Sequence, residues 1–87
     1  MEIVTSTLMK QRAAEAFQRR EVLKSTDDFD IYALPEGLMS HLVLFLWKEG
    51  KNFPENAVPR AFLMPVVIEN RDGYLWEKEA ALAYSGS

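Results

Sequence analysis

A polar turn with an apolar segment on either side restricts the fold of this chain more than any other feature. Residues 70–73 read Asn-Arg-Asp-Gly. Asn, Asp and Gly tolerate the positive φ angles of tight hairpin loops, and we expect Gly73 to supply such an angle. The pattern predicts a β-hairpin over residues 65–78. Pro65 cannot donate a hydrogen bond to a ladder, so it indicates an edge strand, a bulge or the start of a strand.

The size and composition of the chain predict one small globular domain. The chain has 87 residues, of which 48% are apolar and 26% charged, and it has no cysteine. This length is enough for one domain and too short for two, so we expect a domain over residues 1–84 and a flexible tail over residues 85–87. No signal peptide is recognisable and disulfides are excluded, so we expect a cytoplasmic protein.

An N-terminal helix is predicted over residues 7–24. Ser6 or Thr7 can cap its start, and neither glycine nor proline interrupts it. Apolar side chains recur along it at helical spacing and form one narrow stripe. The members of the stripe are Met9, Ala13, Ala16, Phe17 and Leu23. After a polar break, alternating apolar and polar residues over residues 29–34 predict a short strand that ends before Pro35.

Residues 36–49 are compatible with two structures. As a helix, the segment has Pro35 in its first turn and Gly50 just past its end, which are the preferred positions of these residues. As a strand, residues 41–47 form the continuous apolar run that a buried strand also shows. The leucine content and the length favour the helix, which we expect, while the strand alternative stays open.

The remaining segments complete an α+β prediction. Residues 52–60 contain Pro54 and Pro59, which predicts a loop with room for one helical turn. Residues 62–68 are expected to form the first hairpin strand, and residues 77–84 a short last helix. The predicted order is therefore α-β-α-β-β-α, with a small antiparallel sheet.

Few side chains could carry chemistry. His41 is the single histidine and has no thiolate partner for zinc, so we expect it to serve the fold or the surface. Asp27, Asp28 and Asp30 could hold Mg²⁺ or Ca²⁺, but they lack the spacing of an EF-hand loop, and a solvated loop is the simpler interpretation. The sequence has neither a nucleophile elbow nor a phosphate-binding glycine loop. We therefore expect no enzyme, no metal and no cofactor.

Basic residues gather between positions 10 and 24, although the net charge of the whole chain is −3. They are candidate contacts for the phosphates of a nucleic acid. However, Glu15 and Glu21 interrupt them and they flank the apolar stripe on both sides, so a solvated amphipathic helix is the expected explanation. The candidates are Lys10, Arg12, Arg19, Arg20 and Lys24.

The C-terminal segment resembles the wing and last helix of small winged-helix excisionases of mobile elements. The resemblance covers residues 65–84, a hairpin with a polar turn followed by a short helix. It implies a DNA-binding accessory protein of a mobile element or phage as the alternative function. In that family a polar, basic recognition helix precedes the hairpin, whereas residues 38–47 are almost entirely apolar here.

The apolar segment 38–47 leads to the first functional hypothesis. A helix that is apolar on every face has to be buried, and a domain of this size has little material to cover all its sides. A second copy related by a two-fold axis, or a different protein, would cover the rest. We therefore expect a non-enzymatic interaction or regulatory module that forms a homodimer. The candidate anchors, unless they only fill the core, are Trp47, Phe53, Phe62 and Trp76.

Overall fold

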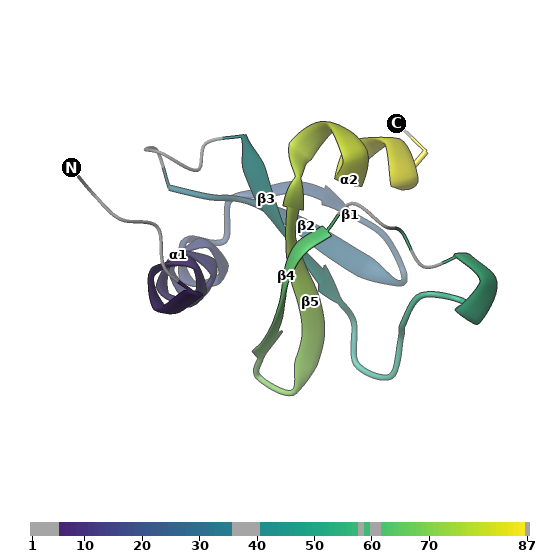
Figure 1. The fold of residues 1–87 in the computed structure, drawn as a ribbon, viewed down its shortest axis with the longest axis horizontal. Coiled ribbons are helices and arrows are strands. Elements are labelled where there is room, and N and C mark those ends of the chain that lie inside the picture. Colours follow the sequence, from purple (N-terminus) through teal and green to yellow (C-terminus); the bar gives the residue numbers. More distant parts are fainter. Residues whose placement is uncertain (1–5, 36–40, 58, 60–61, 87) are drawn as a thin grey trace.

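One antiparallel sheet with a helix on each face makes up the fold. The computed structural model describes residues 6–35, 41–57, 59 and 62–86. In chain order they form α1 (Ser6–Arg19), β1 (Val22–Ser25), β2 (Phe29–Ala33), β3 (Leu42–Trp47), the 3₁₀ turn η1 (Glu55–Ala57), β4 (Phe62–Ile68), β5 (Arg71–Glu77) and α2 (Lys78–Tyr84). The five strands lie in the order β1-β2-β3-β5-β4, and each neighbouring pair is antiparallel. Figure 1 shows α1 and α2 on opposite sides of this sheet. The α+β fold class is therefore confirmed.

Strand β3 lies at the centre of the sheet, in the segment for which the sequence predicted a middle helix. All six of its residues are buried. Its side chains alternate between the two faces, with Leu42, Leu44 and Leu46 toward α1 and Val43, Phe45 and Trp47 toward α2. A strand that is covered on both faces has no polar side, so its sequence is one continuous apolar run. The predicted helix is wrong for residues 42–47, and its first part, residues 36–40, lies outside the described residues.

Helix α1 is shorter than predicted. It ends at Arg19 because Arg20 adopts a left-handed conformation, with a φ of 54°, and its N–H bonds the carbonyl oxygen of Ala16 at 3.3 Å. The chain then reverses and forms β1, which pairs with β2. The helix predicted up to residue 24 is therefore wrong beyond residue 19, and the predicted order of elements lacked this strand.

The β4–β5 hairpin is confirmed, but its loop lies earlier than predicted. The two loop residues are Glu69 and Asn70, with φ angles of 50° and 65°, which is the signature of a type I′ turn. The loop predicted over residues 70–73 is wrong, because Gly73 lies inside β5. A Cβ atom at Gly73 would stand 2.5 Å from the carbonyl oxygen of Phe45. Glycine is therefore needed at this position for close packing and not for a turn.

Two cores lie on opposite faces of the sheet. The α1-side core contains Ala13, Ala16, Phe17, Tyr32, Leu34, Leu42, Leu44, Leu46, Val66 and Leu75. The aromatic core, under α2 and the loop that carries Phe53, contains Phe29, Ile31, Val43, Phe45, Trp47, Phe53, Trp76 and Ala81. Every residue of the apolar run 42–47 belongs to one of these two cores, so the domain itself buries this segment.

The C-terminal end is tied back to the sheet. The predicted helix over residues 77–84 corresponds to α2. Ser85, which the sequence assigned to a tail, donates from its hydroxyl to the carbonyl oxygen of Leu82 at 2.7 Å. Its own carbonyl oxygen accepts a hydrogen bond from the Lys24 ammonium of β1 at 2.9 Å. These contacts hold the end of α2 over the edge of the sheet formed by β1.

Candidate functional site

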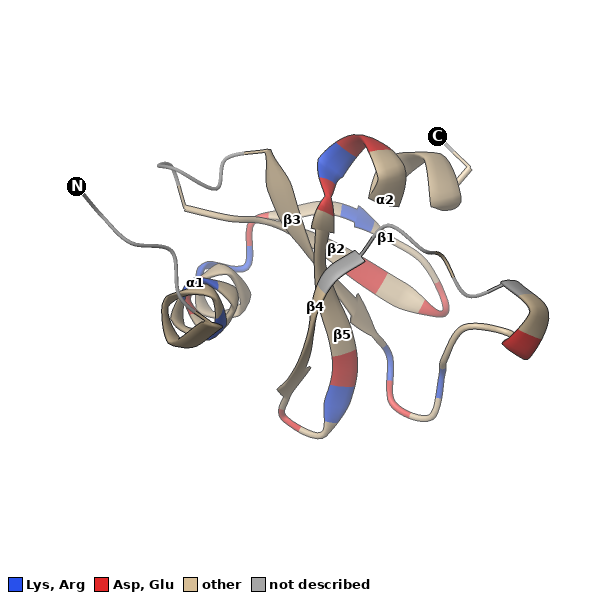
Figure 2. Ribbon diagram, viewed as in Figure 1, with Lys and Arg blue, Asp and Glu red and all other residues tan. Residues whose placement is uncertain are grey.

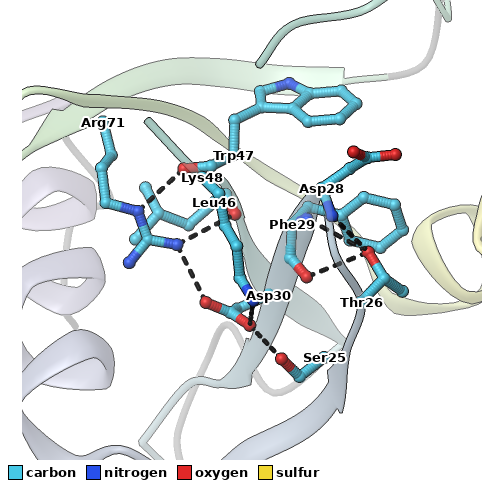
Figure 3. Close-up of polar contacts among 9 residues, drawn as sticks. All are labelled: Ser25, Thr26, Asp28, Phe29, Asp30, Leu46, Trp47, Lys48 and Arg71. Atoms are coloured by element: carbon cyan, nitrogen blue, oxygen red, sulfur yellow. Dashed lines mark hydrogen bonds and ion pairs between the residues drawn. The ribbon is translucent and has the colours of Figure 1, made fainter. Parts of the chain in front are cut away.

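A partly buried ion pair joins strands at the end of the sheet nearest the hairpin loop (Figure 3). Arg71, the first residue of β5, donates through Nη2 to Oδ2 of Asp30 in β2 at 2.9 Å. The same guanidinium donates through Nε to the carbonyl oxygen of Trp47 at 2.8 Å. The other Asp30 oxygen accepts a hydrogen bond from the Ser25 hydroxyl and lies 4.0 Å from the Lys48 ammonium. We call this group the Asp30 cluster.

The contacts of the Asp30 cluster favour a structural role. Burial by itself would raise the pKa of the Asp30 carboxyl, but hydrogen bonds from Ser25 and Arg71 and the charge of Lys48 hold this pKa below its ordinary value. A carboxylate with a lowered pKa and both oxygens engaged is a poor proton acceptor. Ser25 donates its own proton to this weak base, so its hydroxyl is not activated as a nucleophile.

The aspartates of the acidic segment do not converge on one point. Asp30 belongs to the Asp30 cluster, Asp28 lies 3.4 Å from the Lys51 ammonium, and Asp27 is exposed. Thr26 shapes this turn, because its hydroxyl oxygen accepts the N–H of Asp28 at 3.1 Å. Among the residues that the structure describes, no group of three or more His, Asp or Glu side chains is placed to hold a metal ion.

His41 lies exposed at the start of β3, where its carbonyl oxygen accepts the N–H of Lys78 at 2.9 Å. With Glu77, Lys78 and Glu79 it lines a shallow depression at the start of α2. The exposed position fits the surface alternative for this histidine and not the buried one.

Three of the four candidate aromatic anchors lie in the aromatic core. Trp47, Phe53 and Trp76 are 3%, 8% and 2% exposed, and the rings of Trp47 and Phe53 meet edge-on with centroids 4.9 Å apart. Phe62 opens β4, and its side chain lies outside the described residues. The indole N–H groups of Trp47 and Trp76 are buried, and within the described part of the chain they have no hydrogen-bond partner. This burial favours the core interpretation of these residues and leaves them little area for a partner.

The five basic candidates are dispersed over α1, the turn after it and β1. Figure 2 shows blue segments on both α1 and β1. Lys10, Arg19 and Arg20 are exposed. Three of the five are engaged by neighbours: Arg12 with Glu15, Arg20 with the ring of Phe17, and Lys24 with the carbonyl oxygen of Ser85. Strand β3 occupies the position in the chain where a winged-helix protein carries its recognition helix. The winged-helix resemblance is therefore limited to the hairpin and α2, and DNA binding stays a prediction.

Strands β1 and β4 are the two edges of the sheet, and they differ in character. β1 has four residues, a bulge and a lysine, features that discourage pairing with another strand. β4 has seven residues, none of them charged, and its register with β5 shifts between Phe62 and Met64, at the end far from the hairpin loop. Figure 2 shows no acidic or basic colour on the part of β4 that is not grey. Its residue Val67 is 69% exposed, the largest exposed fraction among the large apolar side chains of the described residues. β4 is therefore the edge that is open to pairing.

The type I′ loop fixes which backbone groups of β4 point outward. Such a turn closes with a hydrogen bond between its flanking residues, Ile68 and Arg71. Hydrogen-bonded and non-bonded pairs then alternate along the ladder. Val67 lies opposite Asp72, and Pro65 lies opposite Tyr74. Both pairs are at non-bonded positions. The N–H and C=O of Val67, and the C=O of Pro65, therefore point to the open edge.

Two depressions that share Ala14 and Ile68 in their linings form a groove between α1 and this open edge. Its first part is lined by Lys10, Ala13 and Ala14 of α1 and by residues 65–68 of β4. Its second part continues to the hairpin loop and is lined by Ala14, Phe17, Gln18, Arg20, Ile68 and Glu69. We call it the α1–β4 groove. The sequence signal for it was Pro65 in an uncharged strand, but the groove itself depends on where α1 packs.

Comparisons with protein-family models, with curated proteins and with solved structures found no match. The functional interpretation therefore rests on the surface of the chain itself. None of the described helices is long and apolar enough to cross a membrane.

Proposed function

We propose that this chain is a protein-interaction module that binds protein through the open edge of β4 and the α1–β4 groove. The observation that carries the proposal is the seven-residue, uncharged edge strand with Val67 exposed beside a groove. Folded proteins protect such edges with charges, bulges or short strands, because an unprotected edge pairs with another chain. On β4 this protection is limited to Pro65 and to the shift in register between Phe62 and Met64, and neither lies at Val67.

The groove suits recognition by strand addition. In this mode an extended segment adds to the sheet, its backbone hydrogen bonds supply affinity, and pockets for alternate side chains supply specificity. The edge of β4 supplies the backbone groups, and the apolar floor at Ala13, Phe17 and Ile68 supplies a surface for side chains. This surface differs from the buried tryptophans that the sequence offered as candidate anchors.

Site-specific photo-crosslinking tests the proposal in the cells that produce the protein. A benzophenone amino acid at position 67 should give a covalent adduct with protein, of the chain itself or of another chain. The matched control is position 49, because Glu49 is also exposed but lies in the loop after β3. Mass spectrometry of the adduct should locate the crosslink on β4. Equal adduct yields from the two positions, or none from position 67, would contradict the proposal.

A further inference from the structure

Between the hairpin loop and the register shift at Phe62/Met64, strand β4 offers one complete pair of outward backbone groups, at Val67. Pro65 offers only a carbonyl oxygen, since proline has no N–H. In an antiparallel pair about a two-fold axis, a hydrogen-bonded residue on the axis exchanges both its N–H and its C=O with its own copy. Val67 can take this position and Pro65 cannot. Of these two registers, the edge therefore selects the one in which Val67 faces Val67 of a second copy.

The same register covers the most exposed large apolar side chain. Val67 is 69% exposed, against 45% for Val22 and 43% for Leu23 on the opposite edge. Facing residues of an antiparallel pair have Cβ atoms about 5 Å apart. Two Val67 side chains would therefore cover each other on the α2 side of the joined sheet.

The charges of the α1–β4 groove are complementary under this symmetry. With Val67 facing its copy, Ile68 of one chain faces Val66 of the other, and Glu69, the next residue in the loop, comes close to Pro65 of the other chain. Pro65 lines the groove beside Lys10, and Glu69 lines its other part. Each Glu69 carboxylate is thus brought toward Lys10 of the other copy. Lys10 and Glu69 are both exposed, and neither forms an ion pair within the described part of the chain.

We infer that a second copy of this chain occupies the β4 edge, paired antiparallel about a two-fold axis at Val67, with Lys10 and Glu69 in contact across the interface. The inference rests on the proposed function, because it names the partner of the same edge. The dimer joins the two sheets into one continuous sheet, with both copies of α1 on the same face.

Sedimentation equilibrium of the full chain tests the backbone part of the inference. The wild type should show a concentration-dependent equilibrium between monomer and dimer. Val67→Pro removes the outward N–H without removing a bond to β5, and it should weaken dimerisation about tenfold or more, since each dimer loses two hydrogen bonds. The matched control Val67→Thr keeps the N–H and the branched shape, and it should weaken dimerisation much less. Far-UV circular dichroism checks that both variants are folded.

Charge exchange tests the interface independently of any change in β4 itself. Lys10→Glu and Glu69→Lys should each weaken the dimer roughly tenfold, because two exposed attractive pairs become repulsive. The double variant K10E/E69K should restore dimerisation close to that of the wild type, which a loss of folding could not do. Duplex DNA added to the wild type should leave the dimer unchanged.

Three results would overturn the inference. These are a wild-type chain that stays monomeric up to millimolar concentration, a Val67→Pro variant that dimerises as well as Val67→Thr, and a double charge variant that dimerises no better than the singles. If the chain is monomeric but position 67 crosslinks to a different protein, the inference fails and the proposed function stands. If position 67 gives no adduct either, both fail.

Discussion

The Arg71 guanidinium and the Asp30 carboxylate lie 2.9 Å apart, Nη2 to Oδ2, although their strands β5 and β2 are not neighbours in the sheet. β3 lies between them. Arg71 passes over it and also donates to the carbonyl oxygens of Leu46 and Trp47. A single side chain therefore ties three adjacent strands together beside the hairpin loop.

Removing the carboxylate charge should destabilise the fold. Asp30→Asn leaves the Arg71 guanidinium partly buried without its anion, so we expect the free energy of unfolding to fall by about 2 kcal/mol. Urea denaturation measures this change. Asp27→Asn is the matched control, because Asp27 is exposed, and it should alter stability by less than about 0.5 kcal/mol. Equal losses in the two variants would show that the ion pair contributes nothing specific.

The Asp30 carboxyl should also make the stability of the fold depend on pH in the acid range. Its pKa in the folded chain lies below the ordinary value of 3.8, so the folded state favours the ionised form. This contribution is fully present above pH 3.8 and is lost as the pH falls through the lowered pKa. The difference in urea midpoint between wild type and Asp30→Asn should therefore be largest near neutral pH and shrink in acid. A difference that grows in acid would contradict the assignment.

Gly73 should tolerate no side chain. Gly73→Ala would place Cβ 2.5 Å from the carbonyl oxygen of Phe45, in the middle of the sheet. We expect a loss of about 2 kcal/mol or more in the free energy of unfolding. At Gly50 a Cβ meets no atom of the described residues within 4 Å. Only the φ of 80° is unfavourable for alanine, so Gly50→Ala should cost about 1 kcal/mol. Thermal denaturation should therefore rank Gly73→Ala as clearly the less stable.

The hairpin loop should depend on Asn70. Its φ of 65° is accessible to asparagine and glycine but unfavourable for alanine. Asn70→Ala should lower the free energy of unfolding by about 1 kcal/mol, whereas Asn70→Gly should leave it nearly unchanged. The same denaturation experiment compares the two variants. If alanine and glycine behaved alike, the left-handed conformation at this position would be in doubt.

The sequence located the elements whose signals are local. The hairpin, β2, the loop after Gly50 and α2 follow from turn residues, prolines and alternation. Residues 42–47 could not be assigned in this way, because an apolar run has neither period 2 nor period 3.6, and its structure depends on the layers above and below it. β1 was missed for a related reason, since Leu23 also continues the helical stripe and only pairing with β2 decides its structure.

The candidate sites depend even more on the assembled fold. Asp30 and Arg71 meet because β2 and β5 flank β3, a pairing that the sequence does not contain. The α1–β4 groove needs α1 to pack beside the last strand in the sheet order. Only Pro65 carried a readable signal, that of an edge strand. The apolar side chains that pointed to a homodimer are buried in the two cores, so the proposed dimer depends on the β4 edge instead.

Amide hydrogen exchange at Val67, measured by NMR from micromolar to millimolar concentration, examines this edge residue by residue. Val66 bonds to Gly73 within the hairpin, so its amide should be protected at every concentration. The Val67 amide should exchange freely in dilute solution and become protected as the concentration rises, while the amide of Leu23 on the opposite edge does not change. A Val67 amide that stays unprotected at millimolar concentration, beside a protected Val66, would contradict pairing through β4.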